Sequence, residues 1–222
     1  MPATDFLFSV KGGRFLTHNL KVRNAERSLV NFFPSGVLAL GERTGLFLWQ
    51  LPATFRFDAE RMDSFMRLLP RHSKDGEVVP RQHDDRLRRG ALVDAAAHVT
   101  YRHAIEVLHD TYFHNEFYAI LREHDIGWVI ADTAGNFPYA EDVTSGFVYV
   151  RLHGSTQLYT SGYSDAELDM WAAKIKRWRR AKKDVYVYFD NDAKVHAPFD
   201  ALQLIEQISL LFPGALQSLA LG

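Results

Sequence analysis

Residues 147–155, FVYVRLHGS, carry an arginine and a histidine at the end of an apolar run. Because side chains alternate between the two faces of a strand, Arg151 and His153 share one face, and the opposite face is wholly aliphatic. A buried guanidinium needs an anionic partner or a bound anion, since burying an unpaired charge is costly. The segment therefore predicts either a structural ion pair or an anion-binding site at the end of this strand.

Five other apolar runs also end in residues that ionise or form strong hydrogen bonds. We predict strands over residues 6–10, 45–49, 103–107, 127–131, 147–152 and 185–189. Ligands bind at the C-terminal ends of parallel strands, because the loops there diverge and the side chains at the strand ends converge. The polar residues at these ends are Lys11, Arg14, Thr17, His18, Gln50, Glu106, His109, Asp132, Thr133, Arg151, His153, Asp190, Asn191 and Asp192.

Each of these residues also has a structural interpretation. For Arg151 the alternatives are a buried ion pair with Glu106 and bidentate binding of a carboxylate or phosphate. A single histidine most often caps a loop or bonds to a backbone carbonyl, but several histidines and carboxylates together offer ligands for a divalent metal. That candidate set is His18, Glu106, His109, Asp132 and His153, and it lacks the spacing of a helical His-Glu-x-x-His site.

The residues at two further strand ends have more than one interpretation. Lys11 precedes two glycines, which either let the backbone approach an anion or simply make a turn. The run from Asp190 to Asp192 fits the start of a helix, a cation ligand set or a contact with a hydroxyl-rich ligand.

Composition limits the classes of function. The chain has 222 residues, 47% of them hydrophobic, enough for one substantial core and a single domain over residues 1–222. With a formal net charge of -1, the whole chain creates no electrostatic field that would attract nucleic acid or an acidic membrane, so any anion site must be local.

The composition also bears on the compartment. There is no Cys, which excludes disulfides and thiolate chemistry and suits a reducing compartment. The opening residues lack a signal-peptide pattern, and no uncharged stretch reaches about 18 residues, so we predict a soluble, cytoplasmic protein without membrane contact.

The run KIKRWRRAKK, residues 174–183, is the strongest sequence signal for nucleic-acid binding. However, Trp171, Ile175 and Trp178 have the spacing of one buried helix stripe, which leaves the cations on the solvated face of the same helix. This pattern favours a surface helix over a nucleic-acid site.

The strands alternate with helical patterns, as in parallel α/β proteins. The predicted helices cover residues 25–33, 58–69, 114–124, 165–182 and 198–212. For residues 71–90 we predict a loop with a short helix. The fourth helix begins with Ser164 and Glu167 at capping-box spacing. Six such units fit either an open doubly wound sheet or a TIM barrel that lacks its beginning. No glycine-rich phosphate loop follows any strand, which weakens the nucleotide-binding versions of the open sheet.

Six ordered segments carry a family resemblance: FLFSVKGGRFLTHNLKVRN, LFLWQLP, RHAIEV followed by His109, WVIADTAGNFP, FVYVRLHGSTQLYTSGYS and DVYVYFDNDAKVHAPFDALQL. In this order they resemble the YecE-like family, a domain of unknown function. The resemblance implies a TIM-barrel fold in which these strands are the third to the eighth. The family's opening two strands have no counterpart here, so it implies an α/β parallel barrel truncated at the N-terminus to about six strands, with strand edges open to self-association. The family also places Arg where this chain has Leu108.

The positions that match the family's motifs give the predicted site. The predicted catalytic residues are Glu106, His109, Asp132 and His153, and the predicted ligand-binding residues are Lys11, Thr17, His18, Gln50, Arg151 and Asn191. The first hypothesis is a pocket for a small anionic or hydroxylated ligand, such as a sugar phosphate, that undergoes hydrolysis or proton-transfer isomerisation. In it Lys11 and Arg151 hold the anion. Glu106 or Asp132 acts as the general base, and His153 or His109 moves protons.

Two other hypotheses remain. In one, divalent cations cleave a phosphodiester of nucleic acid, as in an endonuclease, and their ligands are His18, Glu106, His109 and Asp132. In the other, the chain is a non-catalytic binding protein or an inactive fragment.

Overall fold

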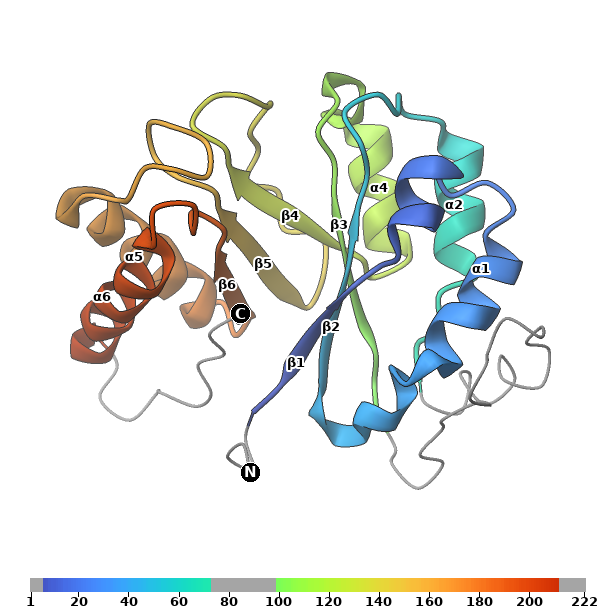
Figure 1. Ribbon diagram of the computed structural model, residues 1–222, viewed down its shortest axis with the longest axis horizontal. Helices are drawn as coiled ribbons and strands as arrows, with labels where there is room; N and C mark the ends of the chain where they lie inside the picture. Colours follow the sequence, from blue (N-terminus) through green and yellow to red (C-terminus); the bar gives the residue numbers. More distant parts are fainter. Residues whose placement is uncertain (1–5, 73–98, 212–222) are drawn as a thin grey trace. The chain divides into compact units, whose positions relative to one another are not determined.

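The computed structural model describes residues 6–72 and 99–211 (Figure 1). The chain forms two compact units, Met1–Ile126 and Gly127–Gly222, which we call unit 1 and unit 2. In both units parallel strands alternate with helices, so the chain is α/β. The prediction of a single domain over residues 1–222 stays a prediction.

Unit 1 contains three parallel strands, with β2 paired to both neighbours. The strands are β1 (Phe8–Lys11), β2 (Thr44–Gln50) and β3 (Arg102–Glu106). The helices are α1 (Ala25–Phe32), α2 (Ala59–Arg67) and α4 (Asn115–Glu123), which Figure 1 shows beside these strands. Short helical turns cover Phe15–Asn19, Phe33–Ser35, Leu38–Arg43 and Asp110–Tyr112.

Aromatic side chains join the sheet of unit 1 to its helices. The Trp49 ring of β2 lies 5.3 Å from Phe65 of α2 and 5.5 Å from Phe32 of α1. Phe47 is two residues earlier and stacks on His103 of β3 at 5.1 Å. The strand residues in these contacts, Phe47, Trp49 and His103, all have odd numbers. Because side chains alternate between the two faces of a strand, the even-numbered residues of β2 and β3 lie on the face away from the helices.

Unit 2 also contains three parallel strands, with β5 paired to both neighbours. The strands are β4 (Gly127–Asp132), β5 (Phe147–Leu152) and β6 (Asp184–Phe189), and the helices are α5 (Asp165–Arg180) and α6 (His196–Leu211). The buried stripe of α5 is as predicted, with Trp171, Ile175 and Trp178 all buried. Helix α5 begins with the predicted capping box between Ser164 and Glu167.

Every predicted strand, and every predicted helix, occurs in the described residues within a few residues of its expected bounds. The last helix begins two residues earlier than predicted, at His196, so Pro198 falls within its first turn. Residues 71 and 72 are described, and His72 pairs with Thr100 in an isolated antiparallel bridge. The predicted loop and short helix after them lie mostly outside the described residues.

Candidate functional site

The C-terminal ends of β5 and β6 bring a cation, an imidazole and a carboxylate together in unit 2. Arg151 donates from Nη2 to Oδ2 of Asp190 at 2.7 Å, and Nδ1 of His153 lies 3.0 Å from the same oxygen. Arg151 and His153 are 7% and 2% exposed, whereas the Asp190 side chain is 39% exposed. We call these three residues the Arg151 triad.

The register explains why the triad forms. Arg151 pairs with Tyr188 across β5 and β6, so His153 and Asp190, each two residues further on, continue along the same face. A hydrogen bond from the Asp190 amide to the Leu152 carbonyl, 2.8 Å long, extends the pairing past the end of β6. The shared carboxylate oxygen thus follows from strand pairing and alternation.

The two contacts of Asp190 differ in kind. The contact with Arg151 is a charge-assisted hydrogen bond, whereas Nδ1 of His153 is close to the carboxylate without the alignment of a hydrogen bond. The second contact is therefore an ion pair when the imidazole is protonated. A guanidinium has five N–H donors in a planar fork, so this residue type can grip an anion bidentately.

The Asp132 side chain lies on the other face of the unit 2 sheet. It pairs with Leu152 rather than with Arg151, so alternation sends it to the face opposite the triad. Its carboxylate contacts the hydroxyl of Tyr163 and accepts from the Ala134 amide at 3.4 Å. Burial raises the pKa of Asp132, and the bonds from Ala134 and Tyr163 only partly oppose that rise.

A second network in unit 2 fixes Asn191 beside the triad. Asn191 is fully buried, and its Nδ2 donates to the Ser161 carbonyl at 2.9 Å and to Oδ2 of Asp200 at 2.7 Å. The same Asp200 oxygen accepts from the Tyr163 amide at 3.2 Å, and the Tyr163 hydroxyl accepts from the Gly154 amide at 3.1 Å. The network ties the residue after Asp190 to the loop that follows His153.

In unit 1 the register gathers three of the predicted residues on one face. Lys11 lies opposite Leu48, Leu48 lies opposite Ala104, and Gln50 lies opposite Glu106. Lys11, Gln50 and Glu106 therefore share the face away from α1 and α2, toward the C-terminal ends of the strands. Glu106 is fully buried.

Thr17 and His18 lie in the short helical turn after β1. The Thr17 hydroxyl donates to the Gly13 carbonyl at 3.3 Å and lies 2.8 Å from Nδ1 of His18. Burial, followed by the charges of Arg14 and Lys11, lowers the pKa of His18. The imidazole of His18 is therefore biased toward its neutral form by burial and by two cations that precede the turn.

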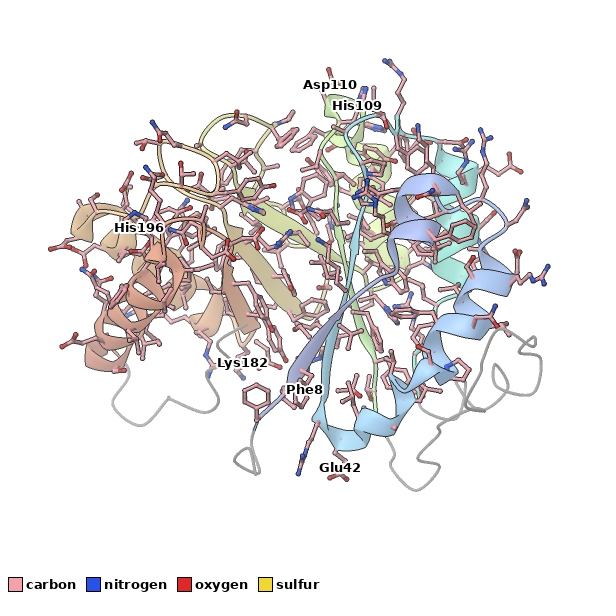
Figure 2. The ribbon with its side chains drawn as sticks, viewed as in Figure 1. Phe8, Glu42, His109, Asp110, Lys182 and His196 are labelled. Atoms are coloured by element: carbon pink, nitrogen blue, oxygen red, sulfur yellow. The ribbon has the colours of Figure 1, made fainter. Side chains whose placement is uncertain are left out.

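His109 caps the short helical turn after β3. Its Nδ1 accepts from the Thr111 amide at 3.2 Å and lies 2.7 Å from Oδ1 of Asp110. Figure 2 shows His109 and Asp110 next to each other beyond the end of β3. This is the loop-capping interpretation that the sequence left open.

A buried histidine that the sequence analysis did not single out lies on the helix-facing side of unit 1. Nδ1 of His103 accepts from Trp49 Nε1 at 3.1 Å, and Nε2 lies 2.7 Å from the Pro70 carbonyl. These partners are satisfied together only when the ring is neutral with its proton on Nε2. Burial lowers the pKa of His103 to about 3. The sequence signal that could have indicated a buried histidine is the pair of aromatic residues Phe47 and Trp49 on the neighbouring strand.

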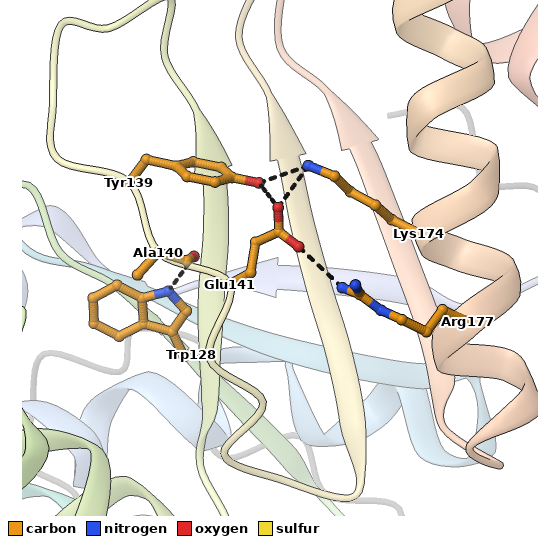
Figure 3. Close-up of polar contacts among 6 residues, drawn as sticks. All are labelled: Trp128, Tyr139, Ala140, Glu141, Lys174 and Arg177. Carbon is orange, nitrogen blue, oxygen red and sulfur yellow. Dashed lines mark hydrogen bonds and ion pairs between the residues drawn. The ribbon is translucent and has the colours of Figure 1, made fainter.

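The basic run of α5 is partly paired within unit 2 (Figure 3). Lys174 lies 2.6 Å and Arg177 3.1 Å from the carboxylate of Glu141 in the β4–β5 loop. The Tyr139 hydroxyl donates to Glu141 at 2.6 Å and accepts from Lys174 at 3.0 Å. We call these four residues the Glu141 cluster. Its contacts support the surface-helix interpretation of the run.

The family model described as "Protein of unknown function DUF72" matches residues 1–219. The chain belongs to the DUF72 family. This confirms the resemblance to the YecE-like family, which is the same family.

Two solved DUF72 proteins resemble the chain. The first, from Thermotoga maritima MSB8, has 24% identity and a TM-score of 0.72, over 92% of this chain and 74% of that chain. The second, from Enterococcus faecalis V583, has 17% identity and a TM-score of 0.64 over the same shares. These likenesses show the fold, which is α/β and TIM-barrel-like, with six strands in the described residues. A comparison with curated proteins gives no match.

The residues predicted from the DUF72 motifs thus fall into separate groups. Unit 2 brings Arg151 and His153 together around Asp190, with Asn191 adjacent, but directs Asp132 to the other face. Unit 1 brings Lys11, Gln50 and Glu106 to one face. No three His, Asp or Glu side chains gather as a metal-binding group in the part of the chain that the structure describes. Across those same residues, no helix is both long and apolar enough to span a membrane.

Proposed function

We propose that the protein is an enzyme that binds a small anionic, hydroxylated ligand of the sugar-phosphate type and moves a proton on it. The proposal rests on one observation, the grouping of Arg151, His153 and Asp190 at adjacent strand ends of unit 2. Strand ends are where parallel α/β proteins place their ligands.

Each residue of the triad has a role in this proposal. Arg151 holds the phosphate, because a planar guanidinium matches two phosphate oxygens. Asp190 positions both side chains and balances the positive charge of Arg151. His153 carries the proton between ligand carbons or onto a leaving oxygen, since imidazole takes up and releases protons near neutral pH. Proton-transfer isomerisation and hydrolysis both use these roles.

Proton transfer is tested by incubating the protein with aldose and ketose phosphates in heavy water. We expect solvent deuterium to appear on the carbon next to the carbonyl, detected by NMR. The variant His153→Gln keeps a polar side chain without a titratable ring, and we expect its exchange rate to fall by at least about a hundredfold. His124→Gln is the control, because Nε2 of His124 lies 2.6 Å from Oδ1 of Asp63 within unit 1, and neither residue belongs to the triad.

Two outcomes contradict the proposal. One is the absence of deuterium exchange and of released phosphate with every sugar phosphate tested. The other is equal activity of His153→Gln and the unaltered protein. Activity that requires an added divalent cation and cleaves phosphodiesters instead supports the metal-dependent alternative.

The sequence-based expectations of a cytoplasmic location and of a chain lacking the family's first two strands remain predictions. The proposed roles of Lys11, Thr17, His18, Gln50, Glu106 and His109 also stay predictions, as does the part of Asp132 as a base.

A further inference from the structure

An exposed tyrosine lies against the histidine of the triad. The ring of Tyr159 meets the ring of His153 edge to face, with 5.5 Å between centroids and an interplanar angle of 76°. Tyr159 is 42% exposed, whereas Tyr149 of β5 and Tyr163 before α5 are 2% and 7% exposed. An aromatic side chain that only fills a core is buried like these two. Tyr159 instead offers an apolar ring surface next to a buried imidazole.

The backbone holds Tyr159 in a conformation that its residue type disfavours. Its φ of 63° lies in the left-handed region, which is uncommon and strained for a bulky residue. Its amide donates to the His153 carbonyl, and its carbonyl accepts from the Ala193 amide at 3.3 Å. The bond to Ala193 comes from the loop after β6, so both loops at the triad fix this residue.

The surrounding groups indicate the chemistry of a ligand that would use this ring. Within unit 2 the ring adjoins His153, and His153 shares Asp190 with Arg151. A ligand with an anionic group and an apolar ring face matches a cation and an aromatic surface placed this close together. Phosphorylated sugars have both features, because the C–H face of a sugar ring packs on an aromatic ring while its phosphate meets the guanidinium.

We propose that Tyr159 is a specificity-determining residue that packs against the sugar ring of a phosphorylated sugar bound at the Arg151 triad. This inference rests on the proposed function and deepens it, because it separates recognition of the ring from recognition of the phosphate. The triad binds any phosphate, and Tyr159 selects those that carry a ring.

The test is isothermal titration of the full chain with inorganic phosphate and with a panel of hexose and pentose phosphates. The variant Tyr159→Asn removes the ring but suits the left-handed backbone, since Asn tolerates this region better than other non-glycine residues. We expect about a tenfold loss of affinity for the tightest sugar phosphate, equivalent to about 1.4 kcal/mol. We expect no more than about a twofold change for inorganic phosphate, because it has no ring to pack.

Matched variants keep the result interpretable. Tyr159→Phe retains the ring and is expected to bind sugar phosphates as the unaltered protein does. Tyr139→Asn removes another exposed tyrosine, 46% exposed and also in unit 2, and is expected to change neither affinity. Circular dichroism of each variant checks that the fold is intact.

The outcomes separate the two proposals. If the unaltered protein binds inorganic phosphate but Tyr159→Asn loses the same factor for both ligand classes, or loses nothing, the inference about Tyr159 is wrong and the proposed function stands. If neither inorganic phosphate nor any sugar phosphate binds, the proposed function fails together with the inference. Binding of a single-stranded oligonucleotide through Tyr159, with sugar phosphates unaffected by its removal, also overturns the inference.

Discussion

Buried His103 limits the stability of the protein in acid. Its folded-state pKa of about 3 lies below the ordinary histidine pKa of 6.5, so near pH 5 the unfolded chain binds a proton at His103 that the folded chain does not. The contribution of neutral His103 to the free energy of unfolding is therefore fully present above pH 6.5, and it is lost as the pH falls from there toward 3. At about pH 5 the expected loss is roughly 2 kcal/mol from this group alone.

Urea unfolding between neutral and mildly acidic pH measures this loss. The variant His103→Gln has no titratable ring, so we expect a flatter dependence of unfolding free energy on pH, at a lower value near neutrality. Exposed His72 gives the comparison variant His72→Gln, which removes a histidine but leaves the contacts of His103 with Trp49 and Pro70 in place. Parallel curves for all three proteins would show that His103 carries no such effect.

At the same residue scale, the face shared by Arg151 and His153 was predictable from alternation alone. Their partner Asp190 was not, although it stood among the polar residues at strand ends, because a single strand's sequence does not say which strand lies beside it. The role of His109 was left open for a related reason. From sequence alone, His109 could either cap a turn or take part in catalysis. The hydrogen bond from the Thr111 amide to Nδ1 of His109 shows the capping role, and only the structure reveals it.

At the scale of elements, the loop after β5 depends on one glycine. Gly154 has a φ of 115°, and a Cβ there would lie 2.4 Å from the Gln157 carbonyl oxygen, a backbone atom that cannot move away cheaply. We expect Gly154→Ala to lower the unfolding free energy by about 1–3 kcal/mol and to disturb the His153 and Tyr159 contact. Thermal denaturation provides the measurement. The control is Gly146→Ala in unit 2, where an added Cβ meets nothing within 4 Å.

The Glu141 cluster anchors the β4–β5 loop to α5. Burial opposes ionisation of Glu141, but bonds from Lys174, Tyr139 and Arg177 outweigh it and lower the pKa. The contribution of ionised Glu141 to stability is therefore present above pH 4.5, the ordinary pKa of glutamate, and is lost as the pH falls through the lowered pKa. We expect Glu141→Gln to cost about 1 kcal/mol at neutral pH in low salt and less in high salt, measured by urea unfolding. A cost that is equal in low and high salt would show that charge pairing is not the source.

The elements themselves were well predicted, for physical reasons visible in particular segments. The capping residues Ser164 and Glu167 and the stripe of Trp171, Ile175 and Trp178 define α5 without reference to the rest of the chain. The conformation of the loop after β5 was not predictable. It depends on a hydrogen bond that the Tyr163 amide donates to Asp200 and on one that the Ala193 amide donates to Tyr159, and both partners are distant in sequence.

At the scale of the whole molecule, the ordered motifs identify the DUF72 family, and the solved relatives establish the TIM-barrel-like fold. Neither supplies a reaction, because one fold hosts many chemistries and function depends on the site. The proposed function therefore depends on the Arg151 triad as a place where a ligand binds.

The most direct test is a crystal structure of the full chain soaked with the tightest-binding sugar phosphate. We predict phosphate oxygens within hydrogen-bond distance of the Arg151 guanidinium, with the sugar next to His153. A ligand bound elsewhere, with Arg151 and Asp190 paired as before, would contradict the account.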